Sequence, residues 1–377
     1  MADPLPPPGA EVLVCGARVA GAAAVRALLQ RGYRVLLSDR QDTGSITALT
    51  RAGARFVGTP ARLPDGVALV VTSPGFRPDH PLLVDAKTRG VDVLGELELA
   101  WRLRGADPPP WLLVTGTNGK TTTVRMLEGI LRAGGLRALA VGNVGVSIID
   151  AVTAADPYDV LAVEASSYQL YWSSTIAPTA GALLNIAPDH LDWHGSMAAY
   201  VTAKIRAWRG AVAIGNADDP QVAALLDTAP AARRRSFTLS EPVDGQLGVR
   251  DGVLTDEAFG GGPLLAAAEV RPPGAHNVAN ALAAAALARV LEVSAAAIAA
   301  GLRSFEPDPH RNQFVAERAG VRYVDDSKAT NAHAARGGGA GGRRAGCRCR
   351  GGPGAGAARR SRAALRPAGQ GVDQRPD

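Results

Sequence analysis

The strongest chemical signal in this sequence is the segment WLLVTGTNGKTTT, residues 111–123. An apolar strand is followed by a glycine-containing loop, a Lys-Thr pair and a helix with one apolar face. Amides of such a loop point at phosphate oxygens, Lys120 can bridge the outer phosphates, and the hydroxyl of Thr121 or Thr122 can hold Mg²⁺. A strict P-loop has glycine where Val114 stands, so this is a shortened variant. The residues expected to contact a nucleoside triphosphate are Gly116, Thr117, Asn118, Gly119, Lys120, Thr121 and Thr122.

Polar residues that follow other apolar strands could complete a metal site. Mg²⁺ takes oxygen ligands beyond the phosphates, usually one or two carboxylates and water. Glu164 ends the strand DVLAVE, and we favour a metal ligand over a plain solvated strand end. His190 also follows an apolar strand, where a ligand role competes with a structural one. Asn143 lies between two glycines, where its amide could face a ligand or simply close a turn.

Lys204, in the segment AAYVTAKIRAW, carries no comparable signal. On the residues alone it is an ordinary helical lysine, and the pattern predicts a solvated side chain.

The elements that position these groups follow an α/β pattern. Strands and helices alternate over the first hundred residues, which predicts a parallel sheet with right-handed crossovers. GARVAG, residues 16–21, opens a helix where a dinucleotide fingerprint would lie, but Arg18 replaces a required glycine, so we expect no nicotinamide or flavin site. Asp39 could accept from a ribose hydroxyl or be an ordinary strand-end residue. TSPG, residues 72–75, could bind an anion or form a plain turn.

Composition narrows the function classes. The total charge is +6, but residues 335–377 hold ten Arg and two Asp and contribute +8, so the first 334 residues carry −2. A nucleic-acid-binding body needs a distributed basic face, which this body lacks. No apolar run reaches the ~18–20 residues of a membrane span, and the N-terminus has no secretory pattern. Three cysteines give no disulfide framework. We expect a cytoplasmic monomer that binds neither nucleic acid nor membrane.

Proline-rich linkers and changes of composition predict four segments. We expect a Rossmann-like N-terminal domain over 1–105, a central P-loop domain over 106–307, the start of a C-terminal domain over 308–334, and a Gly/Arg-rich tail over 335–377.

Seven motifs in order make the chain resemble the Mur ligase family over about residues 10 to 334. They are GTNGKTT, VEASSYQ, NIAPDHLDWHG, AAK, GAHNVANALAA, PHR and DDSKATN, and the last most resembles the branch that adds D-glutamate. The resemblance implies the three-domain α/β architecture of that family and an ATP-dependent amide ligation in peptidoglycan precursor synthesis, hence a role in cell-wall biogenesis and division. The implied substrates are UDP-N-acetylmuramoyl-L-alanine, D-glutamate and ATP, with Mg²⁺ at two sites.

The resemblance also assigns roles to residues at matching positions. It implies that Lys120 contacts phosphates, that Thr121, Glu164 and His190 serve the metal sites, and that Lys204 is carbamylated to become a metal ligand, against the prediction from its surroundings in sequence. The nucleotide side takes Asn277, Asn280, His310, Arg311 and Asp326. The substrate side takes Val19, Ala20, Asp39, Arg40, Ser73, Pro74, Gly75, Asn143, Ser166, Gln169 and Thr330, and Lys328 is a catalytic match in the third domain.

Residues 335–377 do not resemble the family. They contain twelve Gly, ten Arg and two branched aliphatics, too few to offset backbone ordering of ~1–2 kcal/mol per residue. We expect an incomplete third domain followed by out-of-frame translation, with a natural disordered tail as the alternative. The function classes left open are an amide ligase and a nucleotide- and UDP-sugar-binding remnant that has lost catalysis. A nucleic-acid-binding ATPase is a distant third.

Overall fold

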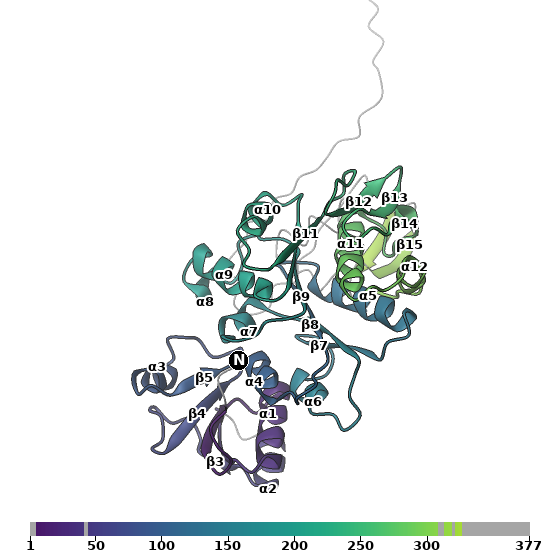
Figure 1. The fold of residues 1–377 in the computed structure, drawn as a ribbon. Coiled ribbons are helices and arrows are strands. Elements are labelled where there is room, and N and C mark those ends of the chain that lie inside the picture. The colour runs from purple at the N-terminus through teal and green to yellow at the C-terminus, as the bar shows by residue number, and fades with distance from the viewer. Residues whose placement is uncertain (1–4, 41–43, 308–312, 319–320, 326–377) are drawn as a thin grey trace, which may run out of the picture. The chain divides into compact units, whose positions relative to one another are not determined.

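The computed structural model describes residues 5–40, 44–307, 313–318 and 321–325. It contains two parallel-rich sheets flanked by helices and a short antiparallel pair, so the predicted α/β class is confirmed (Figure 1). We call the first sheet with helices α1–α4 the N-terminal unit, and the second sheet with its helices the central unit. Among the described residues, no helix is long and apolar enough to cross a membrane.

The N-terminal unit is built on a five-stranded sheet with the order β3-β2-β1-β4-β5, parallel throughout. Its central strands are almost entirely buried, as expected of parallel strands covered on both faces. The strands are β1 (Glu11–Cys15), β2 (Arg34–Ser38), β3 (Arg55–Phe56), β4 (Val67–Thr72) and β5 (Asp92–Leu94). The helices are α1 (Val19–Gln30), α2 (Gly44–Arg51), α3 (Pro81–Thr88) and α4 (Glu96–Leu103).

The central unit has nine strands in the order β14-β13-β12-β11-β10-β9-β6-β8-β7. Seven are parallel, and β13 and β14 extend the sheet in antiparallel fashion. The strands are β6 (Trp111–Thr115), β7 (Ala138–Gly142), β8 (Val160–Glu164), β9 (Ala180–Leu183), β10 (Val212–Asn216), β11 (Arg233–Phe237), β12 (Gln246–Arg250), β13 (Val253–Asp256) and β14 (Gly262–Ala266). Because β6 lies between β9 and β8, the loops after these three strands meet at one edge.

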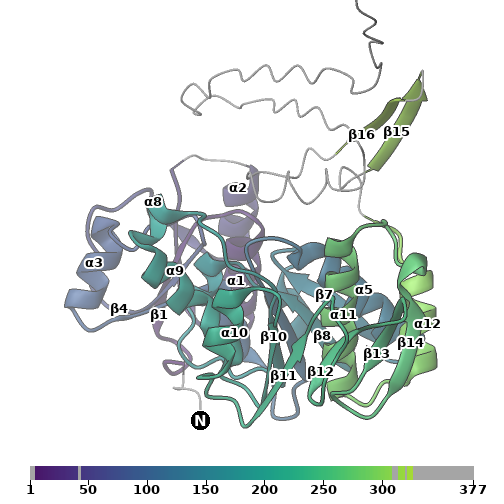
Figure 2. The ribbon, with the colours of Figure 1, turned by 90° about the horizontal axis from the view of Figure 1, so that it is seen from above.

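Short and long helices cover this sheet. The longer ones are α5 (Lys120–Ala133), α9 (Met197–Lys204), α10 (Pro220–Leu226), α11 (Ala275–Val290) and α12 (Ala295–Arg303). The shorter ones are α6 (Ile148–Val152), α7 (Ser167–Tyr171), α8 (Leu191–His194) and the 3₁₀ turns η1 (Ile205–Trp208) and η2 (Ala267–Glu269). Figure 2 shows α5, α11 and α12 grouped beside β12–β14.

Small residues let these helices approach closely. Helix α11 is buried around most of its circumference, and alanines and leucines occupy most of the buried positions. A β-carbon added to Gly301 of α12 would lie 2.4 Å from the Cα of Ile130 in α5, so the two helices touch through their backbones. The helix that begins at the phosphate-binding loop is therefore packed directly against its neighbours.

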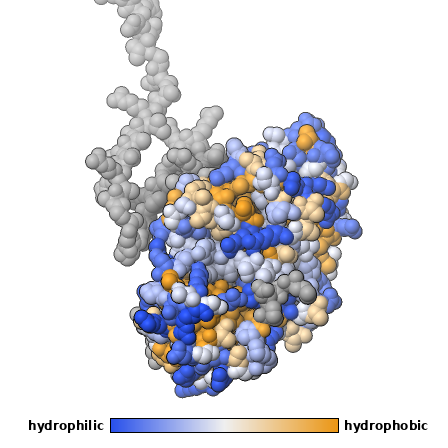
Figure 3. All heavy atoms as spheres, turned by 60° about the vertical axis from the view of Figure 1, so that its left-hand side comes forward, coloured by the Kyte–Doolittle hydropathy of each residue, from blue (hydrophilic) through white to orange (hydrophobic). Residues whose placement is uncertain are grey.

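The two units share one apolar core. Leu97 and Trp101 of α4 belong to the same buried cluster as Leu113 of β6 and Ile149 of α6. Leu170 of α7 belongs to the same cluster. On the face shown in Figure 3, apolar residues form small groups separated by hydrophilic ones.

The third predicted segment is described only in part. Strands β15 (Gln313–Arg318) and β16 (Val321–Asp325) pair antiparallel. His310, Arg311, Asp326, Lys328 and Thr330 lie outside the described residues, as does the Gly/Arg-rich tail. The expected roles of these residues, and the expected origin of the tail, stay predictions.

Candidate active site

The phosphate-binding loop lies at the edge where β6 meets the N-terminus of α5, as the sequence predicts. Gly119, just before the helix, has φ +85°, and an added β-carbon would lie 2.4 Å from Oδ1 of Asn280. Nζ of Lys120 donates to the carbonyl oxygens of Gly116 and Thr117, both at 2.9 Å. The Lys120 side chain therefore folds over the loop that it is expected to serve.

Two residues that we did not single out from the sequence hold this loop in place. Asn185 accepts from the backbone N–H of Asn118 through Oδ1 at 2.8 Å and donates to its carbonyl oxygen through Nδ2 at 3.1 Å. The hydroxyl of buried Tyr200 lies 2.9 Å from Oγ1 of Thr117. The rule that points to Glu164, a polar residue closely following an apolar strand, would also have found Asn185. Tyr200 has no such signal, because its partner is distant in sequence.

Glu164 ends β8 beside β6, at the same edge as the loop. Its side chain is 1% exposed. One carboxylate oxygen accepts from Nδ2 of Asn143 at 3.0 Å, and the other has no hydrogen-bond partner among the described residues. A buried carboxylate oxygen without a partner is costly unless a cation or donor binds it, so Glu164 fits a metal ligand. Asn143 is thereby placed in the site.

In the part of the chain that the structure describes, no cluster of three or more His, Cys, Asp or Glu side chains could hold a metal ion. A cation at Glu164 would need its other ligands from hydroxyls, phosphate oxygens or water.

His190 lies in a turn that precedes α8, with φ +53°. Its ring packs 4.8 Å from that of Tyr168, and Nδ1 lies 3.5 Å from a carboxylate oxygen of Asp189. The imidazole is partly exposed, with 44% of its side-chain surface accessible. This exposure leaves the ring accessible to a ligand.

Lys204 is buried, which makes the prediction of a solvated helical lysine wrong. It ends α9 with 1% exposure, and its Nζ donates to the carbonyl oxygen of Gly116 at 2.7 Å. Its Nζ also lies over the ring of Tyr200, 4.7 Å from the centroid. Burial lowers the pKa of Lys204 well below its ordinary value, and the nearby charge of Lys120 lowers it further. Helical periodicity could not reveal this burial, because Gly116 is far away in sequence.

Ser166 and Gln169 form a capping box at the start of α7, directly after Glu164. The Ser166 hydroxyl accepts from the Gln169 backbone N–H at 3.2 Å, and the Gln169 side-chain oxygen accepts from the Ser166 N–H at 3.0 Å. Gln169 is 2% exposed, and its Nε2 donates to Glu96 of α4 at 3.3 Å. Glu96 is a further residue that sequence reasoning missed.

On the opposite side of the loop, α11 contributes two buried asparagines. Asn280 lies against Gly119, and its Nδ2 donates to Oδ1 of Asn277 at 3.2 Å. Nδ2 of Asn277 donates to the carbonyl oxygen of Pro272 at 2.9 Å. The structure thus brings Asn280, predicted for the nucleotide side, to the phosphate-binding loop.

The predicted uridine site lies at the strand ends of the N-terminal unit. Asp39 accepts from the backbone N–H of Ala17 at 2.7 Å and of Arg40 at 2.6 Å. Oγ of Ser73 donates to the carbonyl oxygen of Cys15 at 2.7 Å. Val19, at the start of α1 with Ala20, is 70% exposed. Asp39 and Ser73 therefore follow β2 and β4, the two strands that flank β1, and Pro74 and Gly75 continue the turn.

Comparisons with known proteins show which family this chain resembles in sequence. A family model for the Mur ligase middle domain matches residues 114–288. The chain is 52% identical over 343 residues to the UDP-N-acetylmuramoylalanine–D-glutamate ligase of Thermobifida fusca, covering 87% of this chain and 74% of that protein. It is 53% identical over 338 residues to the enzyme of the same name from Frankia casuarinae, covering 87% and 71%.

Solved structures share the fold at lower identity. UDP-N-acetylmuramate–alanine ligase from Thermotoga maritima has a TM-score of 0.54 at 21% identity, covering 87% of this chain and 76% of that chain. A Mur ligase from Acinetobacter baumannii has a TM-score of 0.56 at 21% identity, covering 86% and 69%.

Proposed function

The chain belongs to the Mur ligase family, and we propose that it joins D-glutamate to UDP-N-acetylmuramoyl-L-alanine at the expense of ATP. Members of this family use ATP and Mg²⁺. The observation that carries the proposal is the convergence at one sheet edge of Lys120, Glu164 and the buried amine of Lys204. A plain nucleotide-binding domain gives no reason to bury a second lysine against its phosphate loop.

The phosphate-binding loop would hold the triphosphate. The N-terminus of α5 and the ammonium of Lys120 favour negative charge, and the hydroxyls of Thr121 and Thr122 lie in the first turn of the helix. When bound, Mg²⁺ supplies positive charge that stabilises the transferring phosphoryl group. Thr121 and the unpartnered oxygen of Glu164 would face one cation, and His190 with Lys204 a second.

Lys204 suits carbamylation because its amine is disposed to be neutral. A neutral amine nitrogen forms a bond to the carbon of CO₂ and loses one proton to solvent, which turns the side chain into an anion with two oxygens. Burial, which disfavours the ammonium form, favours the reactive neutral one. The product would have the oxygen chemistry that Mg²⁺ prefers.

The proposed ligation proceeds in two steps. A carboxylate oxygen of UDP-N-acetylmuramoyl-L-alanine attacks the γ-phosphorus and ADP leaves, which forms an acyl phosphate. The amine of D-glutamate then attacks the acyl carbon, phosphate leaves and the amine gives up a proton.

The substrate is held by residues of both units. Ser166, Gln169 and Asn143 are proposed to hold the muramoyl end, and Val19, Asp39, Arg40 and Ser73 are proposed to hold the uridine diphosphate. Cytoplasmic location and a monomeric state stay predictions.

The test is formation of UDP-N-acetylmuramoyl-L-alanyl-D-glutamate by the purified chain, followed by mass and by phosphate release. Product should require ATP, Mg²⁺ and both substrates, and L-glutamate should not replace D-glutamate. Binding of ATP with no release of phosphate that depends on the UDP-linked substrate would contradict the ligase proposal.

A further inference from the structure

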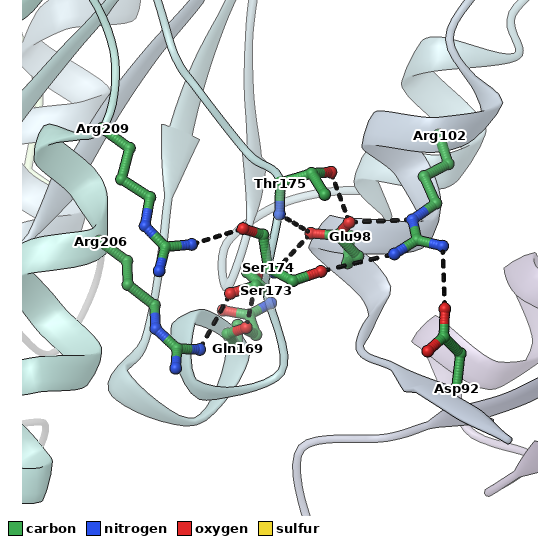
Figure 4. A network of polar contacts seen from close by, with 9 residues as sticks. All are labelled: Asp92, Glu98, Arg102, Gln169, Ser173, Ser174, Thr175, Arg206 and Arg209. Carbon is green, nitrogen blue, oxygen red and sulfur yellow. Dashed lines mark hydrogen bonds and ion pairs between the residues drawn. The ribbon is translucent and has the colours of Figure 1, made fainter. Parts of the chain in front are cut away.

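Helix α4 carries two buried carboxylates that reach different parts of the central unit. Glu96 is 5% exposed, and its two oxygens accept from Oγ of Ser147 at 2.6 Å and from Nε2 of Gln169 at 3.3 Å. Glu98 accepts instead from the backbone of Ser174 and from the backbone and hydroxyl of Thr175, as Figure 4 shows. The same short helix therefore provides a carboxylate that touches the candidate site and one that does not.

Glu96 fixes the orientation of the Gln169 carboxamide. The oxygen of that carboxamide accepts from the backbone and hydroxyl of Ser166 at 3.0 and 3.1 Å, while its nitrogen donates to Glu96. A rotation that exchanged oxygen and nitrogen would place an acceptor against the Glu96 oxygen and donors against donors. Ser166 and Glu96 together leave Gln169 one orientation.

Glu96 also joins two segments that carry candidate site residues. Through Ser147, the cap of α6, it holds the end of the loop that follows β7 and contains Asn143. Through Gln169 it holds the start of α7, which follows β8 and Glu164. These are neighbouring strands, so one carboxylate ties together the two loops at this edge.

We infer that Glu96 is a positioning residue for the muramoyl substrate: it holds the carboxamide of Gln169 and the loop ending at Ser147 in the arrangement that binds that substrate. The inference rests on the proposed function, which supplies the role of Gln169. Ordering these groups before binding removes a cost that the substrate would otherwise meet. Glu96 acts through Gln169 and does not touch the reacting atoms.

Glutamine and leucine at position 96 differ in whether they can keep the hydrogen bonds to Gln169 and Ser147. Burial raises the pKa of Glu96, while hydrogen bonds from Ser147 and Gln169 oppose that rise. A glutamine has an acceptor oxygen and a donor NH₂ group, so it can accept from Gln169 and donate to the Ser147 hydroxyl. A leucine has similar bulk but leaves the Gln169 nitrogen without an acceptor. A positioning role is therefore rescued by glutamine, whereas a role that needs negative charge is not.

The experiment measures the affinity of the full chain for UDP-N-acetylmuramoyl-L-alanine and, separately, for Mg²⁺-ATP, by calorimetry. Glu96→Leu should weaken binding of the UDP-linked substrate about tenfold, because a buried donor loses its partner. Glu96→Gln should bind it within about twofold of the unmodified chain, and Mg²⁺-ATP affinity should change less than about twofold in both. Combined with Gln169→Ala, Glu96→Leu should weaken binding further only by the smaller effect that Ser147→Ala has alone.

Two more variants keep the test decisive. Thr175→Val removes the 2.6 Å bond to Glu98 on the same helix, so it should lower the unfolding temperature and leave both affinities unchanged. Ser147→Ala, a milder change than Glu96→Leu, should weaken only the UDP-linked substrate. The inference would be overturned if Gln169→Ala bound the UDP-linked substrate weakly while Glu96→Leu or Ser147→Ala bound it as tightly as the unmodified chain. The proposed function would stand in that case. An unmodified chain that binds Mg²⁺-ATP but not the UDP-linked substrate would overturn the proposed function as well.

Discussion

The amine of Lys204 lies 2.7 Å from the carbonyl oxygen of Gly116, the first residue of the phosphate-binding loop. A backbone carbonyl can accept from an ammonium or from a neutral amine, so this contact does not fix the charge. Burial and the like charge of Lys120 lower the pKa of Lys204 well below its ordinary value and so favour the neutral amine. The neutral amine is the form that can be carbamylated.

Lys204→Ala should abolish a carbamate signal and most metal-dependent phosphate release. Carbon-13 NMR with labelled bicarbonate should show a carbamate resonance in the unmodified chain and none in the variant. Phosphate release should fall at least about 100-fold, equivalent to ~2.7 kcal/mol of barrier, and short carboxylic acids should restore part of it. An unmodified chain without the resonance, and a variant that keeps its rate, would contradict the assignment.

Lys120→Ala should weaken binding of Mg²⁺-ATP at least tenfold, because a lysine ammonium on phosphate contributes about 1.5–3 kcal/mol. Titration calorimetry measures this directly. Lys87→Ala is the matched control, because Lys87 of α3 lies 4.9 Å from the ring of Trp172 and has no expected role at the loop. Equal affinities in the Lys120 variant and the control would remove the central claim.

Gly119→Ala should disrupt the loop more than the backbone conformation alone explains. Gly119 and Gly135 have φ of +85° and +84°, and a side chain in that region costs roughly 1–2 kcal/mol at either position. At Gly119 the new β-carbon would lie 2.4 Å from Oδ1 of Asn280. At Gly135 the new β-carbon would meet no neighbouring heavy atom within 4 Å. Urea unfolding should show a loss for both variants, and ATP affinity should fall only for Gly119→Ala. A similar loss of ATP affinity in Gly135→Ala would show that the Asn280 contact is irrelevant.

His194 should make stability depend on pH between about 6.5 and about 4. Burial, followed by the neighbouring charge of His190, lowers its pKa to about 4 in the folded chain. Below pH 6.5 the unfolded chain therefore binds more protons than the folded one, and the free energy of unfolding falls as the pH falls. His194→Gln can keep a hydrogen bond to Oγ of Ser167, now 2.9 Å from Nε2, but does not titrate.

Urea denaturation of both proteins at pH 7 and pH 4.5 checks this prediction. The unmodified chain should lose stability relative to His194→Gln as the pH falls. A difference between the two proteins that stays constant across this range would contradict it.

The strand ends were predictable, because each predicted strand is an apolar run that stops at a polar residue. Glu164 follows VLAV and Lys120 follows a loop after WLLVT, so their meeting follows from neighbouring parallel strands. The antiparallel extension was not predicted. Strands β13 and β14, which form it, read VLTD and GPLLA, and neither is an apolar run as long as those of the central strands.

Burial of polar side chains was the part that sequence could not supply. Glu96 and Glu98 alternate with leucines in GELEL, which gives no indication that both carboxylates are covered. Their partners, Gln169 and Thr175, are more than seventy residues away in the chain. Lys204 is similar, since Gly116 and Lys120 surround it from another part of the fold. The family resemblance assigned Lys204 a role, but the helical pattern of the residues around it did not.

The backbone contact between Gly301 and Ile130 restricts how α5 can move. Since Gly301 places no side chain between α12 and Ile130, α5 has no room to move toward α12 at this point without a collision of main chains. Ile130 lies in the last turn of α5, so this contact anchors the helix at the end away from the phosphate-binding loop. The segment of α5 around Ile130 is therefore a natural frame for superposing different ligand states of the central unit.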